Sequence, residues 1–133
     1  MRLVVVSAGL SVPSSTRLLG DRLAAATAAR APAEVRVIAY RICQEALTNV
    51  RVHARASRVE VRLEEARGGL LVSVTDDGEG FDPDRVRATP RRGHVGLTSM
   101  SERATMADGW CQVESAPGQG TCVRFWLPTK DSG

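Results

Sequence analysis

Two oxygen-bearing side chains one helical turn apart are the first feature that could do chemistry. Glu45 and Asn49 lie in a stretch that predicts a helix from Ala33 to about Ala54, so both side chains point to the same side. A carboxylate beside an amide oxygen can bind a hard, hydrated cation such as Mg²⁺. Asparagine is a poor helix former, which indicates that something other than helix stability retains it. The alternative is an exposed polar stripe without a ligand.

An aspartate followed by a glycine-rich segment ends a stretch that predicts a buried strand. Asp76 is followed by Asp77, Gly78, Glu79 and Gly80. A carboxylate at a strand end can accept a hydrogen bond from an exocyclic amine, and glycines let the backbone approach a flat ring closely. A calcium loop needs acidic ligands at alternating positions and a distal glutamate, and that spacing is absent. A plain turn remains the alternative.

Two further glycine clusters follow. Gly93-His94-Val95-Gly96-Leu97 precedes a predicted helix, and backbone N–H groups at a helix N-terminus make a phosphate site. Thr98 and Ser99 could cap the same helix, which is a purely structural role. Gly118-Gln119-Gly120-Thr121 predicts a hairpin turn and, taken alone, nothing more.

Helical and strand periodicities predict the elements that must position these residues. In the helix from Ala33, residues at spacings of three and four form one stripe, which consists of Val35, Ala39, Cys43, Ala46 and Val50. A second stripe beside it consists of Ile38, Ile42, Glu45, Asn49 and His53. Strands are expected at Arg58–Leu63, Leu70–Val74, Trp110–Ser115 and Thr121–Leu127, with a turn at Gly68-Gly69 and a helix at Leu97–Asp108. The long segment from Asp76 to Val95 is typical of a functional loop. This order predicts an α/β fold, a two-layer sandwich of a mixed sheet packed on helices.

The first residues form a separate unit. They predict a strand (Leu3–Ser7), a Ser/Gly/Pro loop and a helix (Arg17–Arg30), which Ala31-Pro32 ends. The segment resembles the opening of flavodoxin-like NADPH-dependent FMN reductases, but nothing after Pro32 continues that fold. The alternatives are a chimeric start or a structural segment that covers a sheet edge. We therefore expect a strand-loop-helix segment at 1–32, a domain at 33–128 and a tail at 129–133.

Composition narrows the functional classes. The 133 residues are 43% hydrophobic and 25% charged, with a formal charge of +3, as expected for one globular domain. The arginines recur singly, without a basic run interleaved with aromatic residues, so we expect no nucleic-acid partner. No apolar stretch reaches the length of a membrane span. Cys43, Cys111 and Cys122 lack metal-ligand spacing and predict reduced thiols in a cytoplasmic protein.

The four clusters together resemble a known family. Tyr40-Arg41-Ile42-Cys43-Gln44-Glu45-Ala46-Leu47-Thr48-Asn49 resembles the N box of sensor histidine kinases of the nitrate-sensor type, in the Bergerat-fold superfamily. Gly93-His94-Val95-Gly96-Leu97-Thr98-Ser99-Met100-Ser101-Glu102-Arg103-Ala104 resembles the family's second glycine box and the helix after it. The likeness covers Ala33 to Pro128 and implies a catalytic domain that binds ATP and Mg²⁺.

This resemblance also implies residue roles. Asn49 would ligate the Mg²⁺ that bridges the phosphates, with Glu45 orienting or activating through a water, and Asp76 would accept a hydrogen bond from the adenine amine. The other ATP-binding positions it implies are Gly78 and Gly80 around the pocket, Gly93, Gly96 and Leu97 at the lid, Thr121 on the base side, and His53 near the phosphates. Val52 departs from the family, in which a basic residue usually precedes that histidine.

Both histidines, His53 and His94, fall inside the nucleotide boxes, so we expect no phospho-accepting histidine in this chain. Phosphoryl transfer would need a separate dimerisation domain that carries the acceptor, and a response regulator as the later partner. The parent kinase could be anchored in a membrane, although we expect no membrane contact by this chain. An ATP-binding regulatory protein of the anti-sigma-factor type is the alternative, and a flavin reductase fragment is a third.

Overall fold

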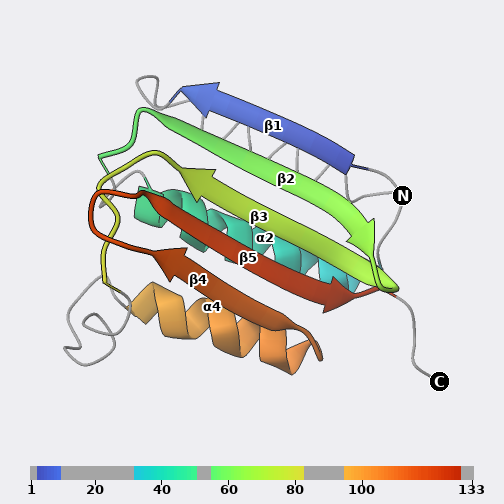
Figure 1. The fold of residues 1–133 in the computed structure, drawn as a ribbon. Coiled ribbons are helices and arrows are strands. Elements are labelled where there is room, and N and C mark those ends of the chain that lie inside the picture. The colour runs from blue at the N-terminus through green and yellow to red at the C-terminus, as the bar shows by residue number, and fades with distance from the viewer. Residues whose placement is uncertain (1–2, 10–31, 51–54, 83–94, 130–133) are drawn as a thin grey trace.

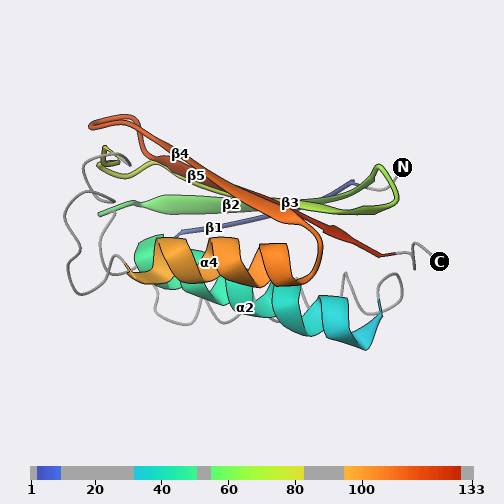
Figure 2. The ribbon, with the colours of Figure 1, turned by 90° about the horizontal axis from the view of Figure 1, so that it is seen from below.

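A computed structural model describes residues 3–9, 32–50, 55–82 and 95–129 of the chain. The strands are β1 (Leu3–Gly9), β2 (Arg58–Ala66), β3 (Gly69–Asp76), β4 (Trp110–Ser115) and β5 (Thr121–Pro128), and the helices are α2 (Ala33–Asn49) and α4 (Val95–Met106). Figure 2 shows both helices on one face of the sheet. The predicted two-layer α/β sandwich is therefore confirmed.

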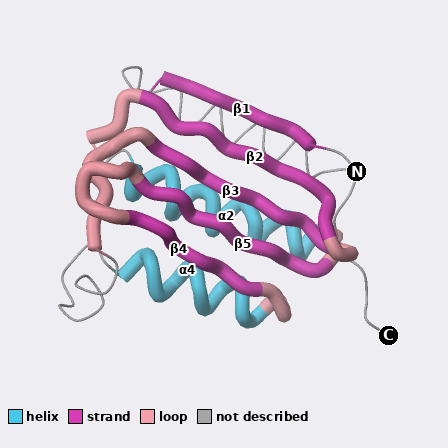
Figure 3. Tube along the Cα trace, viewed as in Figure 1, coloured by secondary structure: helices cyan, strands magenta, loops and turns pink. Residues whose placement is uncertain are grey.

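The five strands form one sheet in the order β1-β2-β3-β5-β4, and all four pairings are antiparallel. The expectation of a mixed sheet is wrong in this respect. Two of the pairings, β2 with β3 and β4 with β5, are hairpins, whose short connections permit only antiparallel strands. β5 then lies between β3 and β4, so segments far apart in the sequence become neighbours (Figure 3).

The β2–β3 hairpin turns one residue earlier than expected. Ala66 pairs with Gly69, and the two residues between them, Arg67 and Gly68, have φ angles of 53° and 72°. Two successive positive φ angles are typical of a type I′ turn, whose twist suits a hairpin. Gly69 pairs with Ala66 and so belongs to the strand, and a Cβ atom there would overlap the carbonyl oxygen of Leu127 and the ring of Trp126.

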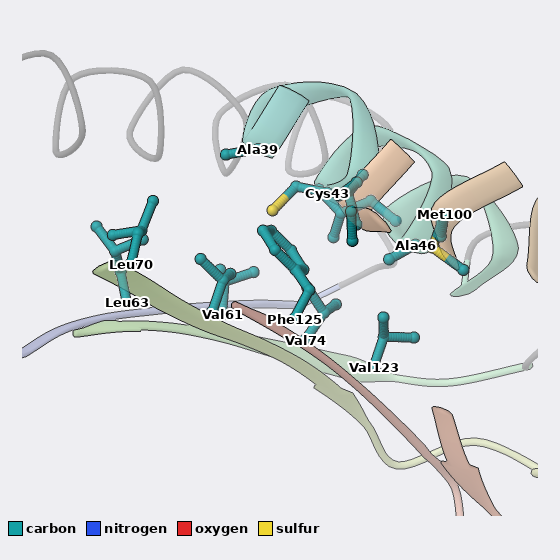
Figure 4. Close-up of a cluster of buried hydrophobic side chains, with 14 of the residues drawn as sticks. Ala39, Cys43, Ala46, Val61, Leu63, Leu70, Val74, Met100, Val123 and Phe125 are labelled. Atoms are coloured by element: carbon teal, nitrogen blue, oxygen red, sulfur yellow. The ribbon is translucent and has the colours of Figure 1, made fainter. Parts of the chain in front are cut away.

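The core lies between the sheet and the buried stripe of α2. Ala39, Cys43, Ala46 and Val50 are buried, as the helical spacing predicts, and Val35 packs against them at the margin. Phe125 of β5 is fully buried, and Figure 4 shows its ring reaching towards Cys43. The same face of the sheet contributes the buried side chains Val59, Val61, Leu63, Leu70, Val72, Val74, Val123 and Leu127.

Cys43 packs as a small apolar side chain, and burial raises the pKa of its thiol. Burial likewise raises the pKa of Cys111 to about 11, and all three cysteines are free. The thiols of Cys43 and Cys111 are therefore protonated at neutral pH, as expected for structural cysteines.

β1 extends the sheet at one edge by pairing along its whole length with β2. This pairing agrees with the interpretation of the first strand as a segment that covers a sheet edge. The helix expected at Arg17–Arg30 lies outside the described residues. Neither α2 nor α4, the helices of the described residues, has the length and hydrophobicity of a membrane span.

Candidate functional site

The helix-facing side of the sheet changes from apolar to polar in its last row. In one row, Val61, Val74, Val123 and Val113 pair across four strands, whereas the next row towards the end of the sheet is Val59, Asp76, Thr121 and Ser115. Residues directly paired across a sheet share one face, so the three polar side chains gather at the same end of the core layer. The strand register therefore creates a polar site at this end.

Asp76 is the buried charge of this row, with 6% of its surface exposed. Its alternation with Val72 and Val74 directs it towards the helix layer. The carboxylate Oδ1 accepts a hydrogen bond from the backbone N–H of Gly78 at 2.8 Å. Burial raises the pKa of Asp76 above its usual value, although the backbone N–H groups of Gly78 and Thr121 oppose that shift, and the charge of Asp77 adds to it.

Asp77, the next carboxylate along the chain, has a structural role. It accepts hydrogen bonds from the hydroxyl of Ser57 at 2.6 Å, and from the backbone N–H groups of Ser57 and Arg58 at 2.9 and 3.0 Å. These bonds hold the pKa of Asp77 below its usual value, and the bond from the Ser57 hydroxyl has the largest effect. Asp77 thus fastens the end of β3 to the start of β2, and Asp76 is left to face the site.

Two glycines let the loop after β3 lie directly against the β4–β5 turn. Gly80 has a φ of 68°, and a Cβ atom there would overlap the carbonyl oxygen of Ala116. Gly120 has a φ of 73°, and its Cβ atom would overlap the carbonyl oxygen of Asp76. A side chain at either position would be strained and would also separate the two segments. The glycines therefore shape the site through close backbone contact.

Ser115 joins the same two segments through its side chain. Its Oγ accepts a hydrogen bond from the backbone N–H of Phe81, donates one to the carbonyl oxygen of Gly120, and lies 2.9 Å from the Oγ1 of Thr121. Sequence reasoning missed Ser115 and the Ser57–Asp77 contact. A hydroxyl at the end of β4, paired with Thr121 across a short hairpin, is the sequence signal that could have found Ser115.

The predicted helix residues lie at this end of the molecule as well. Glu45 and Asn49 are half-buried in the last turns of α2, and Gly96 and Leu97 belong to the first turn of α4. Figures 1 and 2 both show the end of α2, the start of α4, the end of β3 and the β4–β5 turn at one end of the sheet. The fold thus brings four separate sequence clusters to one end.

Three predicted features cannot be placed. His53 and Gly93 lie outside the described residues, as does most of the expected loop between Asp76 and Val95. Two other predicted residues do lie beside Asp76. Gly78 donates its backbone N–H to the Asp76 carboxylate, and Thr121 pairs with Asp76 across the sheet.

The end of α2 carries the two oxygen donors that the sequence predicts as cation ligands. Among the described residues, no group of three or more His, Cys, Asp and Glu could hold a metal ion. Mg²⁺ needs no such cage, because it keeps several waters and takes one or two protein oxygens together with substrate phosphates. Asn49 and Glu45, half-buried one turn apart, supply oxygen donors of this kind.

Comparison with known proteins identifies the family to which this arrangement corresponds. Residues 34–131 match the family model described as histidine kinase-, DNA gyrase B-, and HSP90-like ATPase. The chain is 36% identical over 99 residues to the signal transduction histidine-protein kinase/phosphatase DegS of Brevibacillus brevis, an alignment that covers 74% of this chain and 25% of DegS. It is 42% identical over 89 residues to the sensor histidine kinase LiaS of Bacillus subtilis, covering 67% of this chain and 24% of LiaS. The chain thus spans about a quarter of the length of these relatives.

A solved structure supports the fold. The RsbU and RsbW domains of a Mycobacterium tuberculosis protein match with a TM-score of 0.72 over 96% of this chain and 32% of that one. At 14% identity this likeness concerns the fold alone.

Proposed function

The chain belongs to the family of histidine kinase-, DNA gyrase B- and HSP90-like ATPases, and on this basis we propose that it binds Mg-ATP as the catalytic domain of a two-component sensor histidine kinase. The domain would comprise residues 33–128. The observation that carries the proposal is the buried carboxylate of Asp76 in a polar row at the end of an otherwise apolar sheet face.

Asp76 would recognise the base. A carboxylate with little access to water accepts a hydrogen bond from an exocyclic amine, such as the adenine 6-amino group, and discriminates against a base that presents a carbonyl oxygen there. Thr121 is the register partner of Asp76, and its side chain would lie on the base side of the pocket. Gly78 and Gly80 keep the loop free of side chains that would block a flat ring.

The phosphates would lie between α2 and the start of α4. A helix N-terminus offers free N–H groups and a positive dipole end, so Gly93, Gly96 and Leu97 would bind the phosphates through the backbone. His53 would add a side-chain contact. Asn49 and Glu45 would hold Mg²⁺, which when bound neutralises phosphate charge. Glu45 would also orient a water towards the phosphates.

Phosphoryl transfer would then proceed to a histidine on a dimerisation domain, and from there to a response regulator. The histidine kinase names of the sequence relatives support this context, since both are 36% or more identical to the chain. The anti-sigma-factor alternative is not favoured, because the two sequence relatives described above are both named as histidine kinases. A cytoplasmic location is part of the same proposal.

Calorimetric titration of the folded chain with a non-hydrolysable ATP analogue and Mg²⁺ tests the proposal. We expect saturable 1:1 binding, and a loss of about 10- to 100-fold in affinity for Asp76→Asn, since a hydrogen bond to a charged group contributes about 1.5–3 kcal/mol. Asp108→Asn is the matched control, because Asp108 is exposed on the turn after α4 and has a φ of 64° that asparagine tolerates. Equal affinity of the two variants would refute the role of Asp76.

A further inference from the structure

The face of the sheet that α2 and α4 leave uncovered carries an arginine- and tryptophan-rich groove. Strand register places Arg62, Ser73 and Arg124 in one row across this face, and Leu71, Trp126 and Trp110 in the next. The groove has a volume of about 540 Å³ and is lined by Arg62, Glu64, Ala66, Arg67, Leu71, Ser73, Trp110, Arg124 and Trp126. It lies on the opposite face from Asp76, so it is separate from the proposed nucleotide site.

The aromatic floor of the groove is held in place before any ligand binds. The indole Nε1 of Trp126 donates a hydrogen bond to the carbonyl oxygen of Ala66 at 2.8 Å. The ring also covers Gly69, where a Cβ atom would lie 2.6 Å from it. Trp110 pairs directly with Trp126 across the hairpin and keeps 39% of its surface exposed. Large aromatic side chains fixed on a solvent face indicate a contact surface.

The charge of the groove is positive, since its lining contains Arg62, Arg67 and Arg124 against Glu64. Arg62 contacts Glu60 at 3.0 Å and Arg124 contacts Glu114 at 4.0 Å, but all four side chains are at least 43% exposed. Ion pairs at such exposure are weak, so both guanidinium groups can exchange these partners for a ligand carboxylate. Arginine suits this exchange because its planar group binds a carboxylate through two parallel hydrogen bonds.

We propose that this groove docks an acidic segment of a partner protein, one that also carries an apolar side chain. The carboxylates would pair with Arg62, Arg67 and Arg124, and the apolar side chain would lie on Leu71 and the tryptophan rings. Arginine and tryptophan, with tyrosine, are the residue types most enriched among the side chains that dominate the binding energy of protein interfaces.

Two other occupants fit less well. A second copy related by twofold symmetry would bring two grooves of the same positive net charge together, and such like-charge juxtaposition is costly. Nucleic-acid binding rests on many phosphate contacts, whereas this groove has three arginines and the whole chain a formal charge of only +3.

Tryptophan fluorescence gives a direct test, because Trp110 and Trp126 are the two tryptophans of the chain and both line the groove. The probe is a twelve-residue peptide made of Glu and Asp around a central Leu and free of Trp and Tyr. We expect a saturable change in emission that weakens with salt. The double variant Arg62→Gln/Arg124→Gln should lose about tenfold in affinity, as for two partly exposed ion pairs.

Arg41→Gln is the matched control, because Arg41 is exposed on α2 in the other layer, and it should bind the peptide as the unchanged chain does. Replacing the central Leu by Ala should also weaken binding. The proposal is overturned if the acidic peptide produces no saturable change, if a peptide with Lys in place of Glu and Asp binds equally well, or if Arg62→Gln/Arg124→Gln binds like Arg41→Gln.

Tighter binding of a labelled single-stranded oligonucleotide, lost in the same double variant, would assign the groove to nucleic acid and overturn the proposal. Concentration-dependent dimers in sedimentation, together with burial of both tryptophans in the dimer, would assign the groove to a second copy of the chain. That result would also overturn the proposal. Retained far-ultraviolet circular dichroism of each variant excludes unfolding as the cause of a loss.

Discussion

The Oγ of Ser115 lies 2.9 Å from the Oγ1 of Thr121, and the same Oγ accepts a hydrogen bond from the backbone N–H of Phe81 at 2.9 Å. One hydroxyl at the end of β4 thus holds both the residue paired with Asp76 and the loop that follows Asp76. Because Thr121 is the register partner of Asp76, the position of the candidate base-recognition site depends on this contact.

Ser115→Ala should therefore weaken both stability and nucleotide binding. The substitution leaves the Phe81 N–H and the Thr121 hydroxyl without this partner in a half-buried place, at a cost of about 1–3 kcal/mol. Ser73→Ala is the control, since Ser73 is half-buried on the opposite sheet face, and it should change stability by less than about 0.5 kcal/mol. Urea unfolding measures the first effect, and calorimetric titration with an ATP analogue measures the second. An unchanged affinity in Ser115→Ala would contradict the positioning role.

The two adjacent aspartates should respond oppositely to neutralisation. Burial raises the pKa of Asp76, so its charge opposes folding at neutral pH, and Asp76→Asn should keep or raise the melting temperature. Hydrogen bonds lower the pKa of Asp77, so its charge favours folding, and Asp77→Asn should lower the melting temperature.

The pH dependence of these differences follows from the same shifts. As pH falls through the raised pKa of Asp76, the unchanged chain gains stability, and the advantage of Asp76→Asn should shrink. As pH falls below the ordinary pKa of an aspartate towards the lowered pKa of Asp77, the stabilisation from Asp77 is progressively lost, and the deficit of Asp77→Asn should shrink. Thermal melts between pH 3 and 8 measure both, and a melting temperature lowered equally by the two substitutions would contradict the assigned roles.

Asn49→Ala should weaken the binding of the cation without weakening the binding of the base. Alanine is the better helix former, so α2 should not lose stability. The variant should bind adenosine as the unchanged chain does, while the gain in ATP-analogue affinity on adding Mg²⁺ should largely disappear, about 10-fold or more if one Mg²⁺ ligand is lost. Thr48→Ala, the neighbouring exposed position of α2, is the control. Titrations with and without Mg²⁺ distinguish the cases, and an undiminished Mg²⁺ effect in Asn49→Ala would contradict its role as a ligand.

Much of the fold could be predicted from periodicity. The helical spacing of Ala39, Cys43 and Ala46 identified the buried face of α2, because such a stripe must pack on a partner. The alternation of polar and apolar residues predicted β2. Asp76 at the end of β3 was recognisable because its charge interrupts an apolar strand.

Features that depend on contacts between distant segments could not be predicted. The Ser57–Asp77 hydrogen bond joins two strands across twenty positions, and the Ser115–Phe81 bond depends on β5 lying between β3 and β4. The β2–β3 turn lies one residue earlier than expected, and Gly69 lies in the strand beneath Trp126, a long-range contact that local turn chemistry does not encode. The expectation of a mixed sheet was wrong because the order of strands in the sequence does not define which strands become neighbours or in which direction they run, as for β1 with β2 and β3 with β5.

A crystal structure of the chain with Mg²⁺ and a non-hydrolysable ATP analogue tests the central claim most directly. The account predicts the adenine 6-amino group within hydrogen-bonding distance of the Asp76 carboxylate, and the cation bound to the phosphates and to the side-chain oxygen of Asn49. A nucleotide bound elsewhere, or one whose base does not reach Asp76, would contradict it.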